Sequence, residues 1–161
     1  MAATTSPRPE LPAGRILRFD GVTGAYLDTF VPPGSGGLRQ PVKLLFRTDG
    51  RLYVASQSTG SVLRYDATTG AFLDAFVPQG SGGLSSPRGL TFGPDGSLYV
   101  ADNDPAAIRR YDGKTGAFLD NYLTEANGLS SATYLIFLER PLPARQPPRN
   151  RPRALIPALR R

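Results

Sequence analysis

PRGLTFGPDGSLYVAD, residues 87–102, decides the fold of this chain. Leu90 and Phe92 alternate with other residues before the central turn, and the same alternation follows it, as in two half-buried β-strands. Pro94-Asp95-Gly96 suits a tight turn, because proline presets φ, aspartate bonds its own backbone and glycine accepts a positive φ. The stretch therefore predicts a β-hairpin.

The hairpin belongs to a longer unit that recurs every 46 residues. Residues 16–61 and 62–107, aligned without a gap, are identical at 25 of 46 positions. Two more strands follow the hairpin, AIRRYD (107–112) and AFLDNYL (117–123). A period of about 40 to 50 residues built from four short antiparallel strands is typical of one β-propeller blade. We therefore expect an all-β fold, a partial β-propeller of about three four-stranded blades.

The repeat divides the chain into an array flanked by two tails. We expect a half blade at 16–31, full blades at 42–77 and 88–123, a lone inner strand at 133–138, a disordered N-terminal segment at 1–15 and an Arg/Pro-rich tail at 139–161. The GSGGLxxP stretches at 34–41 and 80–87 are expected to connect the outer strand of one blade to the inner strand of the next. Closed propellers have at least about four blades, so this array is predicted to be open.

Charge is concentrated in the tail. Of the 19 Lys and Arg, seven lie in residues 140–161 without any acid, which leaves 12 against 13 Asp and Glu in the rest of the chain. Three interpretations of this proline-rich end stay open: a disordered end, a frameshifted reading frame, and a basic segment that binds an acidic surface or nucleic acid. We do not expect nucleic acid to be a partner.

Composition removes several classes of protein. There is no cysteine, so disulfides and thiolate metal sites are excluded. No run of 18 apolar residues is present, so no membrane span is predicted. MAATTSPRPELPAG at the N-terminus lacks the apolar core of a secretory signal, and the sequence leaves the compartment open.

The repeat resembles a known group of proteins. PxGLxFGPDGSLYVAD, followed by IRRYD and TGAFLDxF, looks like NHL-repeat propellers and is similar to six-bladed propellers of the gluconolactonase and streptogramin-lyase type. The resemblance covers roughly residues 16–138 and implies the fold more than an activity, since propellers carry unrelated functions. Asn103-Asp104-Pro105 departs from the Asn-Asn-Arg usual at that place in NHL repeats.

The catalytic residues that the resemblance implies do not carry over. Streptogramin lyases use a histidine, and this chain has none. Gluconolactonase-like members hold a divalent metal through Glu, Asn and Asp, but the three glutamates here, Glu10, Glu125 and Glu139, match no such motif on an inner strand. Enzymatic activity stays undecided, with the residues favouring none. The alternative is a fragment of such an enzyme that lacks its catalytic blades.

Charged residues that recur in every unit are predicted to be structural. They are Asp20, Asp66 and Asp112 before the TG turns, Asp28, Asp74 and Asp120 on the outer strand, and Arg18, Arg64 and Arg110 beside aromatic residues. The non-repeating run Asp102, Asn103 and Asp104 offers three oxygen ligands, a weak signal for calcium against a solvated loop. No other cofactor or metal is expected.

The sequence thus favours a non-catalytic propeller module that acts as a binding scaffold for a protein or small ligand. Loops at 34–41, 80–87 and 102–106 are expected to line its binding face. The candidate contact residues are Arg39, Lys43, Arg88 and Asn103. Because 16–31 and 133–138 look like complementary parts of one blade, a homodimer that completes a propeller is a further possibility.

Overall fold

The computed structural model of the chain describes residues 13–138, so the expectations for residues 1–12 and for the tail at 139–161 lie outside the described residues. Within this range the fold is all-β, with three antiparallel sheets. The N-terminal sheet consists of β1 (Ile16–Phe19) and β2 (Tyr26–Val31). The middle sheet consists of β3 (Pro41–Phe46), β4 (Arg51–Ser56), β5 (Ser61–Asp66) and β6 (Phe72–Val77). The C-terminal sheet consists of β7 (Pro87–Phe92), β8 (Leu98–Asn103), β9 (Ala106–Tyr111) and β10 (Phe118–Thr124).

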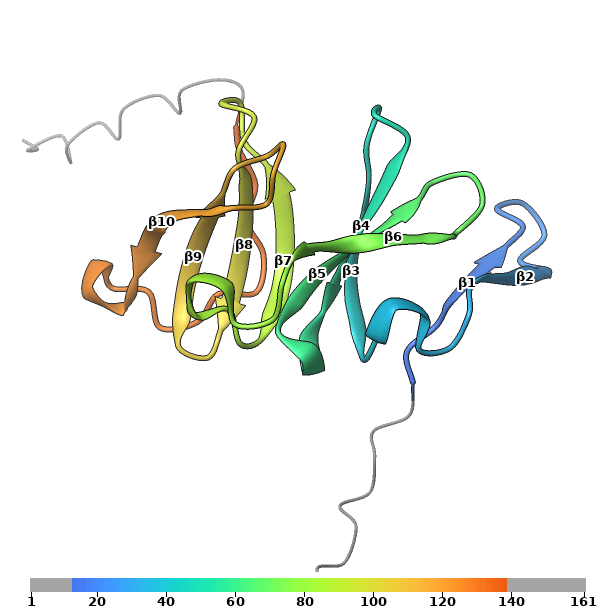
Figure 1. The fold of residues 1–161 in the computed structure, drawn as a ribbon, viewed down its shortest axis with the longest axis horizontal. Helices are drawn as coiled ribbons and strands as arrows, with labels where there is room; N and C mark the ends of the chain where they lie inside the picture. The colour runs from blue at the N-terminus through green and yellow to red at the C-terminus, as the bar shows by residue number, and fades with distance from the viewer. Residues whose placement is uncertain (1–12, 139–161) are drawn as a thin grey trace, which may run out of the picture.

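The three sheets follow one another across the molecule in chain order (Figure 1). In each sheet, strands that are consecutive in sequence are hydrogen-bonded neighbours. The predicted hairpin is confirmed, since β7 pairs antiparallel with β8 and Phe92 lies opposite Leu98. The equivalent strands β3 and β4 pair in the same way. The strand expectations at 16–31, 42–77 and 88–123 are therefore confirmed to within a residue or two at each end.

The repeated aspartates cap the turns between the last two strands of each sheet. In the middle sheet, Oδ1 of Asp66 accepts hydrogen bonds from the backbone N–H groups of Thr68 at 2.9 Å and Thr69 at 2.8 Å. Gly70 then takes φ = 72°, a conformation that glycine adopts without steric cost. Asp20 and Asp112 make the same bonds in the other two sheets. The sequence prediction of a structural role for these residues is confirmed.

The repeated arginines pair with the repeated aspartates of the last strand. Arg64 donates from Nε to Oδ1 of Asp74 at 3.0 Å and from Nη2 to Oδ2 at 2.5 Å, a bidentate contact across β5 and β6. Its guanidinium carbon also lies 4.8 Å from the ring centre of Phe76. The pairs Arg18–Asp28 and Arg110–Asp120 repeat the arrangement. These arginines therefore make contacts within the sheets, in keeping with the structural role predicted for them.

Apolar cores fill the spaces between neighbouring sheets. Leu52 and Val54 of β4 pack toward the N-terminal sheet, while Tyr53 and Ala55 of the same strand pack toward the C-terminal sheet. All four are essentially fully buried. Successive residues of a strand point to opposite faces, so β4 needs apolar residues at every position to be covered on both sides. The middle sheet is thus sandwiched between the other two.

Each connector locks onto the sheet that follows it. Short 3-10 turns, η1 (Ser35–Gly37) and η3 (Ser81–Gly83), occupy the GSGG stretches. The buried hydroxyl of Tyr65 donates to the carbonyl of Ser35 at 2.8 Å, and that of Tyr111 donates to the carbonyl of Ser81 at 2.9 Å. The connector role predicted for both stretches is confirmed.

Residues 133–138, expected to be a lone inner strand, form no strand. The segment nevertheless lies against the first two strands of the C-terminal sheet. The rings of Phe137 and Tyr99 are 4.8 Å apart, and a Cβ added to Gly89 would come within 2.5 Å of the carbonyl oxygen of Thr133. The expectation fails because no described strand follows to provide a hydrogen-bonding partner, and a ladder needs two strands.

Residues 13–15, expected to be disordered, are held in place. Ala13 forms a β-bridge with Arg39, and the N–H of Gly14 donates to the carbonyl of Leu38 at 2.9 Å. Gly14 is buried, and a Cβ at this position would lie 2.6 Å from Cδ of Pro41. The segment is ordered because the first connector supplies backbone partners that are distant in sequence.

Candidate binding surface on β3, β7 and residues 133–138

Four residues were expected on binding loops, and the structure places three of them on strands. Lys43 lies in β3 and Arg88 in β7, because both strands begin at the proline that ends each connector. Arg39 remains in a connector, where its backbone N–H and C=O both bond the hydroxyl of Ser56. Asn103 is the last residue of β8. The four residues therefore do not form one loop surface.

The connector edge of the molecule is held together by its own polar side chains. Gln57 donates from Nε2 to Oγ of Ser86 at 3.1 Å, which joins the middle sheet to the second connector. One repeat later, Ser131 donates from Oγ to Oδ1 of Asn103 at 3.0 Å. Gln57 and Asn103 are 46 positions apart, so the same latch recurs. These hydrogen bonds help to hold each connector against the neighbouring sheet.

Lys43 reaches across β7 to the segment beyond it. Its Nζ lies 5.8 Å from the ring centre of Tyr134, a cation–π contact. Gly89, which occupies the position of Lys43 in the next repeat, leaves room for this contact. A Cβ there would lie 3.1 Å from Cα of Tyr134. Absence of a side chain at Gly89 thus brings residues from two repeats together.

Arg88 precedes Gly89 in β7. Its Nε is buried and has no hydrogen-bond partner among the described residues. Neither Arg88 nor Lys43 forms an ion pair with an acid in the described part of the chain, whereas the repeated arginines are paired. A buried guanidinium nitrogen without a partner is unusual in a folded protein and calls for an explanation. We name Lys43, Arg88 and Tyr134 the basic surface.

The candidate calcium ligands are not brought together. Asp102 is fully buried in β8, where Oδ1 accepts from the N–H of Ser86 at 2.7 Å and Oδ2 from Nε of Arg109 at 2.8 Å. Asn103 bonds Ser131, and Asp104 is exposed in the turn after β8. Residues 13–138 contain no cluster of three or more acidic side chains that could hold a metal ion. The solvated-loop interpretation of Asp102 is also wrong, since its carboxylate is inside the sheet pair.

Sequence reasoning missed the partner of Asp102. Arg109 is 4% exposed and also donates from Nη1 to the carbonyl of Gly82 at 2.7 Å and to Oδ1 of Asn121 at 2.9 Å. The repeat contains a signal that points to this cluster. Asp102, Arg109 and Asn121 replace the Ser56, Leu63 and Ala75 of the previous unit, so three positions change from small or apolar to polar together.

No family model matches the chain, and no curated protein is significantly similar to it. Within residues 13–138 there is also no helix of the length and apolarity needed to cross a membrane.

Proposed function

We propose that the chain is a non-catalytic β-propeller module of the NHL type whose basic surface binds an acidic ligand, such as a glutamate-rich segment of a protein. The two four-stranded sheets support the architectural part, because they repeat one strand order, one set of turn caps and one connector latch, as successive propeller blades do. The sheets thereby act as a rigid base for the residues of the basic surface.

One observation carries the ligand class. Lys43 and Arg88 lie on adjacent first strands and have no acidic partner among the described residues, although every repeated arginine has one. A charge that is partly buried and unpaired is costly, and a carboxylate from a partner offsets that cost. Arginine in particular matches the geometry of a carboxylate through two parallel hydrogen bonds.

The test is a titration of the full chain with a synthetic glutamate-rich peptide, followed by calorimetry. Lys43→Gln and Arg88→Gln are each expected to weaken binding about tenfold, since a hydrogen bond to a charged group contributes about 1.5–3 kcal/mol. Lys114→Gln removes the same charge from an exposed turn at the end of β9 and is expected to leave the affinity unchanged. Added salt should weaken binding by the wild-type chain.

Two results would contradict the proposal. Equal losses in Lys43→Gln and Lys114→Gln would show that binding follows net charge rather than the basic surface. Equal affinity for a peptide with glutamine in place of glutamate would show that the carboxylates are not recognised. In either case the basic surface has no role as an acidic-ligand site.

A further inference from the structure

One face of β10, the last strand of the C-terminal sheet, is exposed, whereas the corresponding face of β6 in the middle sheet is buried. Tyr122 and Leu123 of β10 are 49% and 38% exposed. The residues at the same repeat positions in β6, Phe76 and Val77, are 4% and 0% exposed because the C-terminal sheet covers them. Both pairs consist of an aromatic residue followed by an aliphatic one, so the difference in exposure comes from the sheet that covers β6 and has no counterpart over β10 in the described chain.

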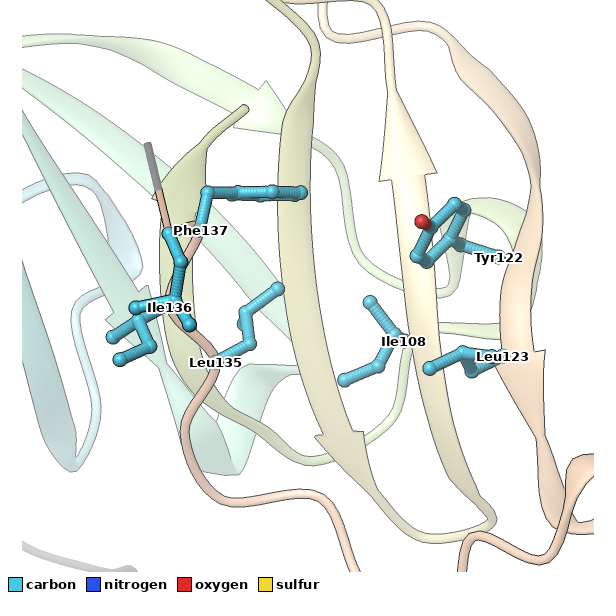
Figure 2. A pocket seen from close by; sticks show the side chains of 7 residues that line it. Ile108, Tyr122, Leu123, Leu135, Ile136 and Phe137 are labelled. Atoms are coloured by element: carbon cyan, nitrogen blue, oxygen red, sulfur yellow. The ribbon is translucent and has the colours of Figure 1, made fainter. Parts of the chain in front are cut away.

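A pocket marks the uncovered region. It has a volume of about 350 Å³ and lies between residues 135–138 and the outer strands β9 and β10. Figure 2 shows Leu135 and Phe137 pointing toward the sheet and Ile136 pointing away from it, with Tyr122 across the pocket. The segment 133–138 therefore covers only the inner half of this face. The outer half lacks a covering strand pair.

The opposite end of the molecule exposes the complementary surface. Phe19 of β1 is 55% exposed, whereas its repeat equivalents Tyr65 and Tyr111 are fully buried against the preceding connector. Leu44 and Phe46 of β3 are likewise 39% and 58% exposed. The N-terminal sheet has no described sheet on its outer side, and it supplies only an outer strand pair.

A close contact at one glycine of the turn before the last strand shows how neighbouring sheets align. Gly70 and Gly116 are buried, and a Cβ at either would overlap the carbonyl of Phe30 or Phe76 in the sheet before it. Gly24 holds the same turn position and a φ of 72°, but it is exposed with nothing within 4 Å of an added Cβ. By the repeat, the matching carbonyl belongs to Tyr122.

We infer that a second copy of this chain docks head to tail on the first. The outer face of β1 and β2 in one copy covers Tyr122 and Leu123 of the other, and Gly24 seats on the Tyr122 carbonyl. Residues 133–138 then complete the inner half of the same layer, with Ile136 turned toward Leu44 and Phe46. The proposal is independent of any ligand of the basic surface.

The chain itself contains the model for this contact. The N-terminal sheet already packs on the middle sheet, and the middle sheet packs on the C-terminal sheet, each through the same repeat positions. A second copy extends that series by one more equivalent interface. The tail at 139–161 lacks the strand and turn pattern of β1 and β2. The two docking surfaces, the outer face of β1 and β2 and the exposed face of β10, are different. Each bound copy therefore leaves one surface free, and the contacts either close into a ring or continue as an open array.

The experiment measures the solution mass of the full chain by light scattering after size exclusion, at rising concentration. The wild-type chain is expected to give a mass of two or more 17.3 kDa chains. Phe19→Glu disrupts the docking surface on β1 and β2, and Tyr122→Lys disrupts the exposed face of β10. Each variant alone is therefore expected to be monomeric. Both side chains are about half exposed, and circular dichroism will confirm that the variants fold.

Mixing the two variants distinguishes head-to-tail docking from other contacts. Phe19→Glu keeps the exposed face of β10 intact, and Tyr122→Lys keeps the surface of β1 and β2 intact. An equimolar mixture is therefore expected to give a species of two chains. Leu73→Glu is the matched control, since Leu73 is also exposed but lies on the outer strand of the middle sheet. It should assemble like the wild type.

Three outcomes would overturn the inference. A monomeric wild-type chain at all concentrations would show that no second copy binds the uncovered face. Unchanged assembly in Phe19→Glu or in Tyr122→Lys would place the contact elsewhere. Failure of the mixture to associate would indicate a symmetric contact rather than a head-to-tail one.

Discussion

Arg109 donates from Nε to Oδ2 of Asp102 over 2.8 Å, and both side chains are buried between the middle and C-terminal sheets. Ser56 and Leu63 occupy these two positions one repeat earlier, where Leu63 packs in the apolar core. The same backbone site thus accepts either a buried ion pair or a serine with a leucine. The pair must change as a unit, because either charge alone would be buried without compensation.

The first prediction compares the stability lost when one member of the ion pair is replaced with the stability lost when both are replaced. Asp102→Ser and Arg109→Leu are each expected to destabilise the fold by about 3–5 kcal/mol, because each leaves one buried charge unpaired. The double variant restores the arrangement of the middle sheet and is expected to lose far less stability than the sum of the single changes. Urea unfolding of the wild type and the three variants measures this coupling directly.

Asn121→Ala offers a control in the double variant, because Asn121 pairs only with Arg109 in this cluster. Its replacement should cost nothing further once Arg109 is leucine. Strict additivity of Asp102→Ser and Arg109→Leu would contradict the interpretation of a coupled pair.

The second prediction concerns acid unfolding. The backbone N–H of Thr69, followed by that of Thr68 and the Thr69 hydroxyl, lowers the pKa of Asp66 below its usual value. Asp20 and Asp112 have lowered pKa values for the same reason. A lowered folded-state pKa means that the stabilisation is complete above the unfolded pKa of about 3.9 and is lost as pH falls through the folded value. Urea midpoints should therefore drop below about pH 4.

Replacement of a turn aspartate tests this cause. Asp66→Asn should reduce stability at neutral pH and flatten its fall in acid. Asp104→Asn is the control, since Asp104 is exposed and accepts no hydrogen bond within the described chain. An identical acid profile for the wild type and Asp66→Asn would show that the turn carboxylates do not govern acid unfolding.

The third prediction compares two glycines with the same backbone. Gly80 and Gly116 both have φ = 74°, so alanine strains the backbone equally at either, by about 1–2 kcal/mol. A Cβ at Gly80 meets nothing within 4 Å, whereas a Cβ at Gly116 overlaps the carbonyl of Phe76. Gly116→Ala should therefore cost about 1–3 kcal/mol more than Gly80→Ala in thermal unfolding. Equal costs would mean that the sheets do not approach each other as described.

The fourth prediction tests the bond between each connector and the next sheet. Tyr65→Phe and Tyr111→Phe each remove a buried hydroxyl that donates to a connector carbonyl, and each should cost about 1 kcal/mol. Tyr122→Phe alters an exposed ring and should be neutral, within about 0.5 kcal/mol. Equal effects of all three changes in urea unfolding would argue against the connector bonds.

Burial also raises the pKa of both tyrosines above the usual value near 10. A raised folded-state pKa means that the stabilisation is complete below the unfolded pKa and is lost as pH rises past it. The wild type should therefore lose stability above about pH 10, and Tyr65→Phe should lose less over the same range. Spectroscopic titration of tyrosine in the folded chain follows the same ionisation.

The sequence by itself determined the local architecture. The period of 46 residues, the alternation in stretches such as 87–92 and the Asp-x-x-Thr-Gly turns predicted every described strand, and they also predicted one at 133–138 that does not form. These features are local, because alternation, turn caps and glycine conformations depend on residues within a few positions of each other.

Only the tertiary structure decided which charges are buried, paired or left without a partner. Arg109 and Arg110 are neighbours in sequence, yet one lies between two sheets and the other pairs with Asp120 at the surface. Likewise, Lys43 meets Tyr134 only because Gly89 leaves space between them. The environment of these side chains depends on how the sheets stack, so strand alternation and turn motifs do not locate such contacts, although the joint change at Asp102, Arg109 and Asn121 points to one of them.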